Sequence, residues 1–112
     1  METDRELLEL AAKAAGIKLH VWGTKGAENF ADMDAAPFGK LWNPLTDDGD
    51  ALRLAVKLHI QVMPQNDGRY CACRNFSMRE GYLIDAEETG DPYTATRRAI
   101  VRAAAEIGKA MP

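Results

Sequence analysis

The chain has 112 residues, of which 46% are hydrophobic and 28% charged, and its formal net charge is −3 at pH 7. This composition excludes a disordered or fibrous protein, and the length predicts a single domain over residues 1–112 that buries about 65% of its unfolded surface. A weakly acidic chain lacks the positive field that drives nonspecific binding to nucleic acids, so no nucleic-acid partner is predicted.

The first predicted element is a helix over about residues 4–15. Thr3 and Glu6 have the spacing of a capping box, and Gly16 can take the left-handed conformation that ends a helix. Alternating apolar residues from Ile17 to Trp22 then predict a short strand. The N-terminal segment resembles neither a signal peptide nor a membrane span, which predicts a cytoplasmic protein without a membrane partner.

Periodicity disappears between residues 23 and 45, where glycine and proline recur. Long irregular segments are uncommon inside compact domains and often carry function, so this segment is the first candidate for a partner-binding surface. The side chains predicted to form that surface are Phe30, Met33, Phe38, Leu41 and Trp42. The alternative is a long connector that folds back onto the core, where most aromatic residues lie, through Phe30, Phe38, Leu41 and Trp42.

A second helix is predicted to begin after Asp47, whose carboxylate can cap it. Its buried stripe is predicted to be Ala51, Leu54, Ala55 and Leu58. The stripe repeats at helical spacing, so one face of this helix is expected to pack on the core.

Two further strands, residues 59–63 and 70–74, are predicted to flank a turn at residues 66–68. A two-residue turn would place Pro64, which has no N–H, at a hydrogen-bonded position, and a three-residue turn would avoid that conflict. With either turn, Pro64 predicts that the first of these strands lies near a sheet edge. Residues 81–85 are predicted to form a third β segment.

Asp91 followed by Pro92 predicts the start of the last and longest helix. Its buried stripe is predicted to be Ile100, Ala103, Ala104, Ile107 and Met111. The many alanines suggest that this helix approaches a sheet closely. The order of elements therefore predicts an α+β fold, with a small, mostly antiparallel sheet of three to four strands layered with three helices as an α/β/α sandwich.

No pattern in the sequence predicts catalysis or a cofactor. Residues 23–26 lack the spacing of a phosphate-binding loop, and Cys71 and Cys73 do not have the spacing of a zinc site. Helix capping explains the carboxylates at residues 47–50 better than calcium binding does, and Ser77 lacks the surroundings of a hydrolase nucleophile. We therefore expect a protein that is not an enzyme, binds no metal or cofactor, and keeps both cysteines reduced.

One basic cluster, Arg97, Arg98 and Arg102, lies on the last predicted helix. Charged residues at this spacing usually form a solvated helix face, here paired with Glu106. Nucleic-acid binding through the last helix is the weaker alternative.

Two segments carry a resemblance to a known family. Trp42-Asn43-Pro44 precedes residues 50–56, and Asp91-Pro92-Tyr93 precedes residues 96–104, with the predicted hairpin between them. This pattern resembles the phage ABA sandwich family over roughly residues 3–111. The resemblance implies a small phage or prophage protein with a sheet layered with helices, and it implies no activity or catalytic residues.

The leading functional hypothesis is a nonenzymatic accessory viral protein, of phage or prophage origin and unknown function, in the cytoplasm of a host bacterial cell. It would bind a host or phage protein and modulate host processes or defence. The alternative is a small-ligand or nucleotide-binding protein that uses residues 23–45 as a pocket wall. A homodimer remains open as an arrangement for either hypothesis.

Overall fold

The computed structural model describes residues 3–17, 19–22, 28–31, 40–65, 70–74, 82–85 and 90–112, and places side chains at 3–17, 42–63 and 90–112. The helices in these residues are α1 (Asp4–Ala15), α2 (Asp48–Lys57) and α4 (Pro92–Ala110). The strands are β1 (Leu19–Trp22), β2 (Glu28–Ala31), β3 (Lys40–Leu41), β4 (Gln61–Gln65), β5 (Tyr70–Arg74) and β6 (Tyr82–Asp85).

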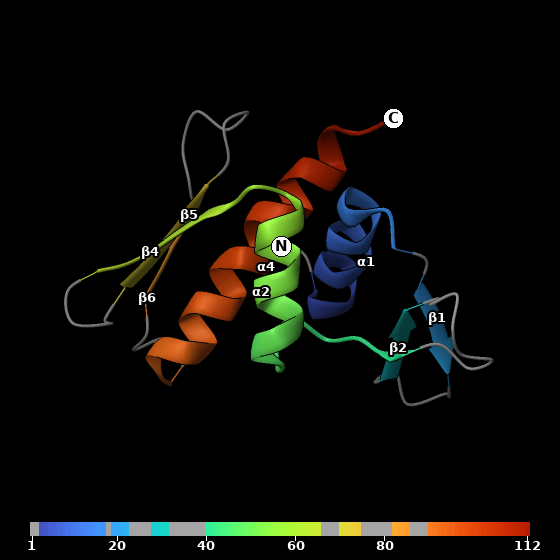
Figure 1. The fold of residues 1–112 in the computed structure, drawn as a ribbon, viewed down its shortest axis with the longest axis horizontal. Helices are drawn as coiled ribbons and strands as arrows, with labels where there is room; N and C mark the ends of the chain where they lie inside the picture. The colour runs from blue at the N-terminus through green and yellow to red at the C-terminus, as the bar shows by residue number, and fades with distance from the viewer. Residues whose placement is uncertain are drawn as a thin grey trace.

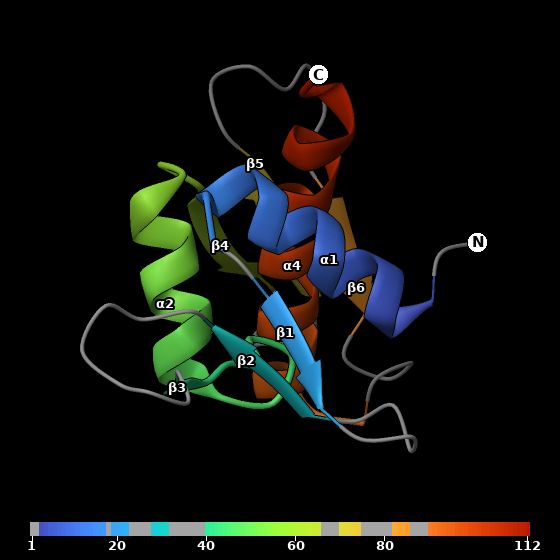
Figure 2. The same ribbon diagram turned by 90° about the vertical axis from the view of Figure 1, so that its right-hand side faces the viewer.

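The strands form two separate antiparallel sheets, in the orders β1-β2-β3 and β4-β5-β6. Helix α4 lies between α1 on one side and the β4-β5-β6 sheet on the other, and α2 also packs against α4 (Figure 1). Figure 2 shows β1 and β2 below α1, away from the other sheet. A helix, rather than a sheet, therefore occupies the centre of the molecule.

The predicted α/β/α sandwich is wrong. Where side chains are placed, 68% of the residues are helical and only 5% lie in a strand. The helices do not cover both faces of one sheet, because the strands divide into two small sheets on opposite sides of the helices (Figure 1). The core described by the structure is accordingly a helical one, to which α1, α2 and α4 contribute most of the buried side chains.

The composition of α4 explains why it occupies the centre. A helix with apolar residues on every side must be buried on every side. Helix α4 has small or apolar residues on most of its sides. The buried ones are Ala95, Ala99, Ile100, Val101, Ala103, Ala104, Ala105 and Gly108. The predicted single stripe was too narrow, and it wrongly included Met111, which is exposed at the end of the helix.

Helix α1 crosses α4 at very close range. The Arg98 guanidinium pairs with the Asp4 carboxylate at 2.7 Å on one side of the contact, and Lys13 Nζ donates to the Met111 carbonyl oxygen at 3.1 Å on the other. Between them, Gly108 lies against the backbone of Leu10, where an added Cβ would overlap the carbonyl oxygen and lie 2.9 Å from the carbonyl carbon. A glycine near the end of α4 thus allows two helix backbones to meet, a contact that the sequence did not predict.

The helix starts agree with the sequence predictions. Thr3 and Glu6 form the capping box of α1, and the carboxylates of Asp47 and Asp91 accept hydrogen bonds from the first-turn N–H groups of α2 and α4. The end of α2 differs from the prediction, because His59 turns into the left-handed region at φ 54°. Since that turn ends the helix rather than beginning a strand, β4 starts at Gln61 and not at residue 59.

Strands β4 and β5 form the predicted hairpin, in which Val62 pairs with Cys73 and Pro64 with Cys71. This register is symmetric about Asp67 and Gly68. Residues 66–69, which connect the two strands, lie outside the described part of the chain. In the sheet, β5 is central and β4 lies at an edge. The edge position predicted from Pro64 is confirmed.

Candidate functional site

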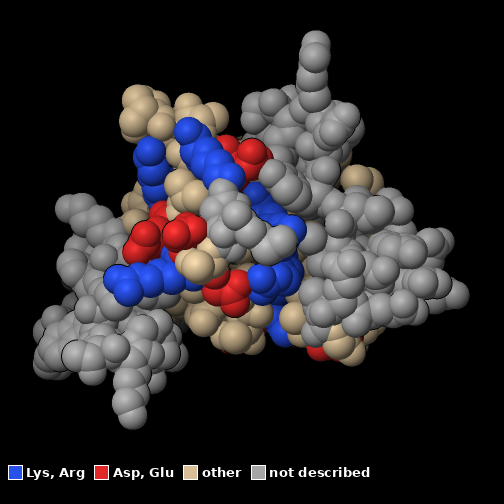
Figure 3. Space-filling model, turned by 180° about the vertical axis from the view of Figure 1, so that it is seen from behind, with Lys and Arg blue, Asp and Glu red and all other residues tan. Residues whose placement is uncertain are grey.

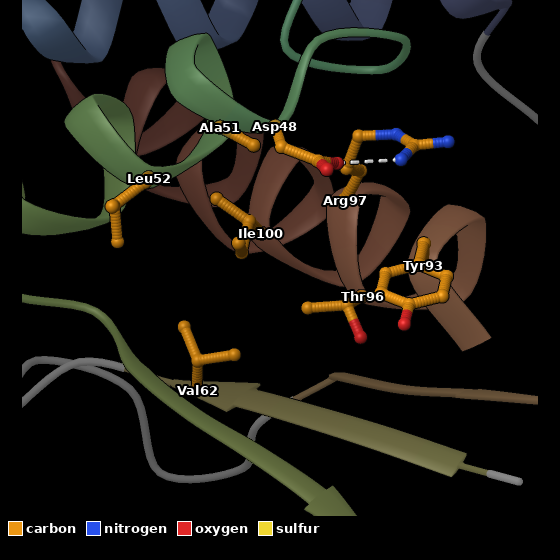
Figure 4. Close-up of a pocket in the computed structure, with 8 residues that line it drawn as sticks. All are labelled: Asp48, Ala51, Leu52, Val62, Tyr93, Thr96, Arg97 and Ile100. Atoms are coloured by element: carbon orange, nitrogen blue, oxygen red, sulfur yellow. Dashed lines mark hydrogen bonds and ion pairs between the residues drawn. The ribbon is translucent and has the colours of Figure 1, made fainter. Parts of the chain in front are cut away.

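An apolar groove lies between α2, α4 and the edge strand β4. Its volume is about 330 Å³, within the range of small-molecule and side-chain binding sites. Its lining residues are Asp48, Ala51, Leu52, Val62, Tyr93, Thr96, Arg97 and Ile100. Figure 4 shows Leu52 of α2 and Ile100 of α4 facing Val62 of β4 across the groove. We refer to this site as the α2–β4 groove.

Large apolar side chains remain exposed at the α2–β4 groove. Leu52, which lines the groove, is 63% exposed, and Val56, one turn further along α2 and outside the lining, is exposed to a similar degree. Tyr93, in the first turn of α4, is 68% exposed. Single exposed apolar residues are normal on protein surfaces, but several of them around one cavity are typical of a binding site.

One end of the groove is closed by an ion pair. Arg97 Nη1 donates to Asp48 Oδ1 at 2.7 Å, its Nε donates to the Leu45 carbonyl oxygen at 2.8 Å, and its Nη2 donates to Thr94 Oγ1 at 3.0 Å. With only 17% of its side chain exposed, Arg97 joins α4 to the turn that precedes α2. This cation is therefore engaged by the fold.

The Thr94 hydroxyl continues this network to the helix cap. Thr94 Oγ1 donates to Asp91 Oδ2 at 2.6 Å, and the Thr94 N–H donates to Asp91 Oδ1 at 2.9 Å. The bond from the hydroxyl, followed by the bond from the N–H, lowers the pKa of the Asp91 carboxyl below its ordinary value of 3.8. Asp91 therefore stays ionised and holds the first turn of α4, which presents Tyr93 and Thr96 to the groove.

The segment Trp42-Asn43-Pro44 has a structural role. The buried carboxylate of Asp50 accepts from the Asn43 N–H at 2.9 Å and from Arg53 Nη2 at 2.7 Å, which ties the turn to α2. Trp42 is only 6% exposed, and Pro44 is fully buried. These residues anchor the start of α2, which carries one wall of the groove.

The predicted partner-binding residues do not form a described site. Trp42 belongs to the core, which leaves little of its side chain for a partner. Phe30 lies in β2 and Leu41 in β3, two strands whose side chains lie outside the described set, and Met33 and Phe38 lie outside the described residues altogether. The expectation that residues 23–45 lack regular structure is wrong, because β2 and β3 lie there, and β2 pairs with both β1 and β3.

The arginines of α4 act mainly between elements rather than as a solvated row. Arg97 reaches α2 and Arg98 reaches Asp4 of α1, whereas Glu106 pairs with Lys109 at 3.5 Å. Figure 3 shows Lys and Arg side chains interspersed with Asp and Glu on the rear face. Such a mixed surface lacks the uniform positive charge of a nucleic-acid footprint.

Sequence reasoning did not identify the α2–β4 groove, although one signal was present. Leu52 and Val56 stand outside the buried stripe of α2 and repeat at an interval of four residues. A second apolar line on a helix that already has a buried face indicates either further burial or a binding surface. The exposure of both side chains favours the binding surface.

Among the described residues, no group of three or more His, Cys, Asp and Glu side chains is arranged to hold a metal ion. No helix in the same part of the chain is both long and apolar enough to cross a membrane. Comparisons with family models, curated proteins and solved structures find no match to this chain. The resemblance to the phage ABA sandwich family therefore stays a prediction from the sequence.

Proposed function

We propose that this protein acts by binding a protein partner through the α2–β4 groove and does not act as an enzyme. The observation that carries the proposal is the exposure of Leu52 and Tyr93 around an apolar cavity bounded by two helices and a strand. Burial of a large apolar side chain contributes about 1.5–3 kcal/mol, so a few such contacts supply useful affinity.

The polar groups around the groove favour binding over chemistry. Arg97 and Asp48 neutralise each other, and the Thr96 hydroxyl donates to the Pro92 carbonyl oxygen at 2.8 Å. These groups therefore serve the fold, and the lining that remains is largely apolar. We further propose, from the sequence resemblance alone, that the partner is a host or phage protein and that the chain is a phage or prophage accessory protein.

Affinity capture from a bacterial lysate tests the proposal with two matched variants. Leu52→Glu places a charge in the groove, whereas Met111→Glu makes the same change at an exposed site at the other end of α4. We expect a stoichiometric protein that the unmodified chain and Met111→Glu retain and that Leu52→Glu loses. Equal capture by all three proteins, or no captured protein, would contradict the proposal.

A small molecule in the groove is the second candidate, because a volume of about 330 Å³ is also suitable for one. Mass spectrometry of the purified protein before and after denaturation tests this reading. A bound metabolite that Leu52→Glu releases and Met111→Glu retains would favour it over a protein partner.

A further inference from the structure

We draw no further inference here: the strongest candidate, the α2–β4 groove, belongs to the site already described, and nothing in the described residues shows what covers it.

Discussion

Two contacts of helix α4 differ in how their space is filled. Against α1, Gly108 meets the backbone of Leu10 so closely that no Cβ fits. Against α2 and β4, the neighbouring elements diverge and leave a cavity of about 330 Å³. Gly108 lets the backbones of the first contact meet and removes any room for a ligand, whereas the side chains of the second contact line a cavity large enough for one.

The difference separates two parts of the surface of one helix, one that stabilises the fold and one that we propose binds a partner. The α1–α4 contact depends on backbone proximity and therefore tolerates little change. Exposed side chains of the α2–β4 groove can be substituted with little effect on folding, so such substitutions should alter the proposed binding alone.

The largest expected effect is a difference in stability between alanine variants of two leucines on α2. Leu54 is 2% exposed and belongs to the core, so Leu54→Ala should lower the free energy of unfolding by about 2–5 kcal/mol. Leu52→Ala should change it by about 0.5 kcal/mol or less, because this side chain is largely in solvent. Urea denaturation of both variants measures the difference. A cost for Leu52→Ala equal to that for Leu54→Ala would mean that Leu52 is a core residue and not the wall of a site.

A smaller effect is expected from adding a methyl group at the α1–α4 contact. Alanine is ordinarily a better helix residue than glycine by about 1 kcal/mol, but at position 108 the added Cβ overlaps the Leu10 backbone. We expect Gly108→Ala to lower the free energy of unfolding by about 1–3 kcal/mol, as overpacking does elsewhere.

Gly49→Ala is the matched control for that prediction. An added Cβ at Gly49 would lie 3.2 Å from the Arg53 guanidinium and from Asp47 Oδ2, the cap of α2, so these side-chain ends would have to shift by a few tenths of an ångström but no backbone atom would. In the same thermal or urea denaturation, the control should therefore cost clearly less stability than Gly108→Ala. A higher unfolding midpoint for Gly108→Ala would show that α1 and α4 are not in close contact.

The smallest effect concerns the cap that supports one end of the groove. Because hydrogen bonds from Thr94 lower the pKa of Asp91 in the folded protein, its contribution to stability is complete above the ordinary value of 3.8. That contribution is lost as the pH falls through the lower folded value. Asp91→Asn keeps a good capping group but cannot titrate, so it should reduce the loss of stability in acid.

Urea denaturation between neutral pH and about pH 2 measures this dependence. The unmodified protein should lose more stability than Asp91→Asn over the acidic part of that range. Identical pH profiles for the two proteins would show that Asp91 does not carry the predicted linkage.

Local signals in the sequence determined the starts of α1, α2 and α4, the helices of the described residues. Thr3 with Glu6, Asp47, and Asp91 before Pro92 act on the backbone within one turn, so their effect needs no distant partner. Pro64 likewise placed β4 at an edge, because a missing N–H is a property of the residue itself. The sequence did not predict the end of α2, because His59 takes a left-handed conformation that is more typical of glycine.

Only the tertiary structure decided which elements meet. The alanines of α4 are compatible with packing against a sheet or a helix, and their positions alone do not distinguish the two. The division of the strands into two sheets depends on pairings between distant residues, which local preferences do not specify. The lining of the α2–β4 groove comes from α2, β4 and α4, which lie far apart in the sequence, so the space between them is a property of the assembled fold and of no single segment.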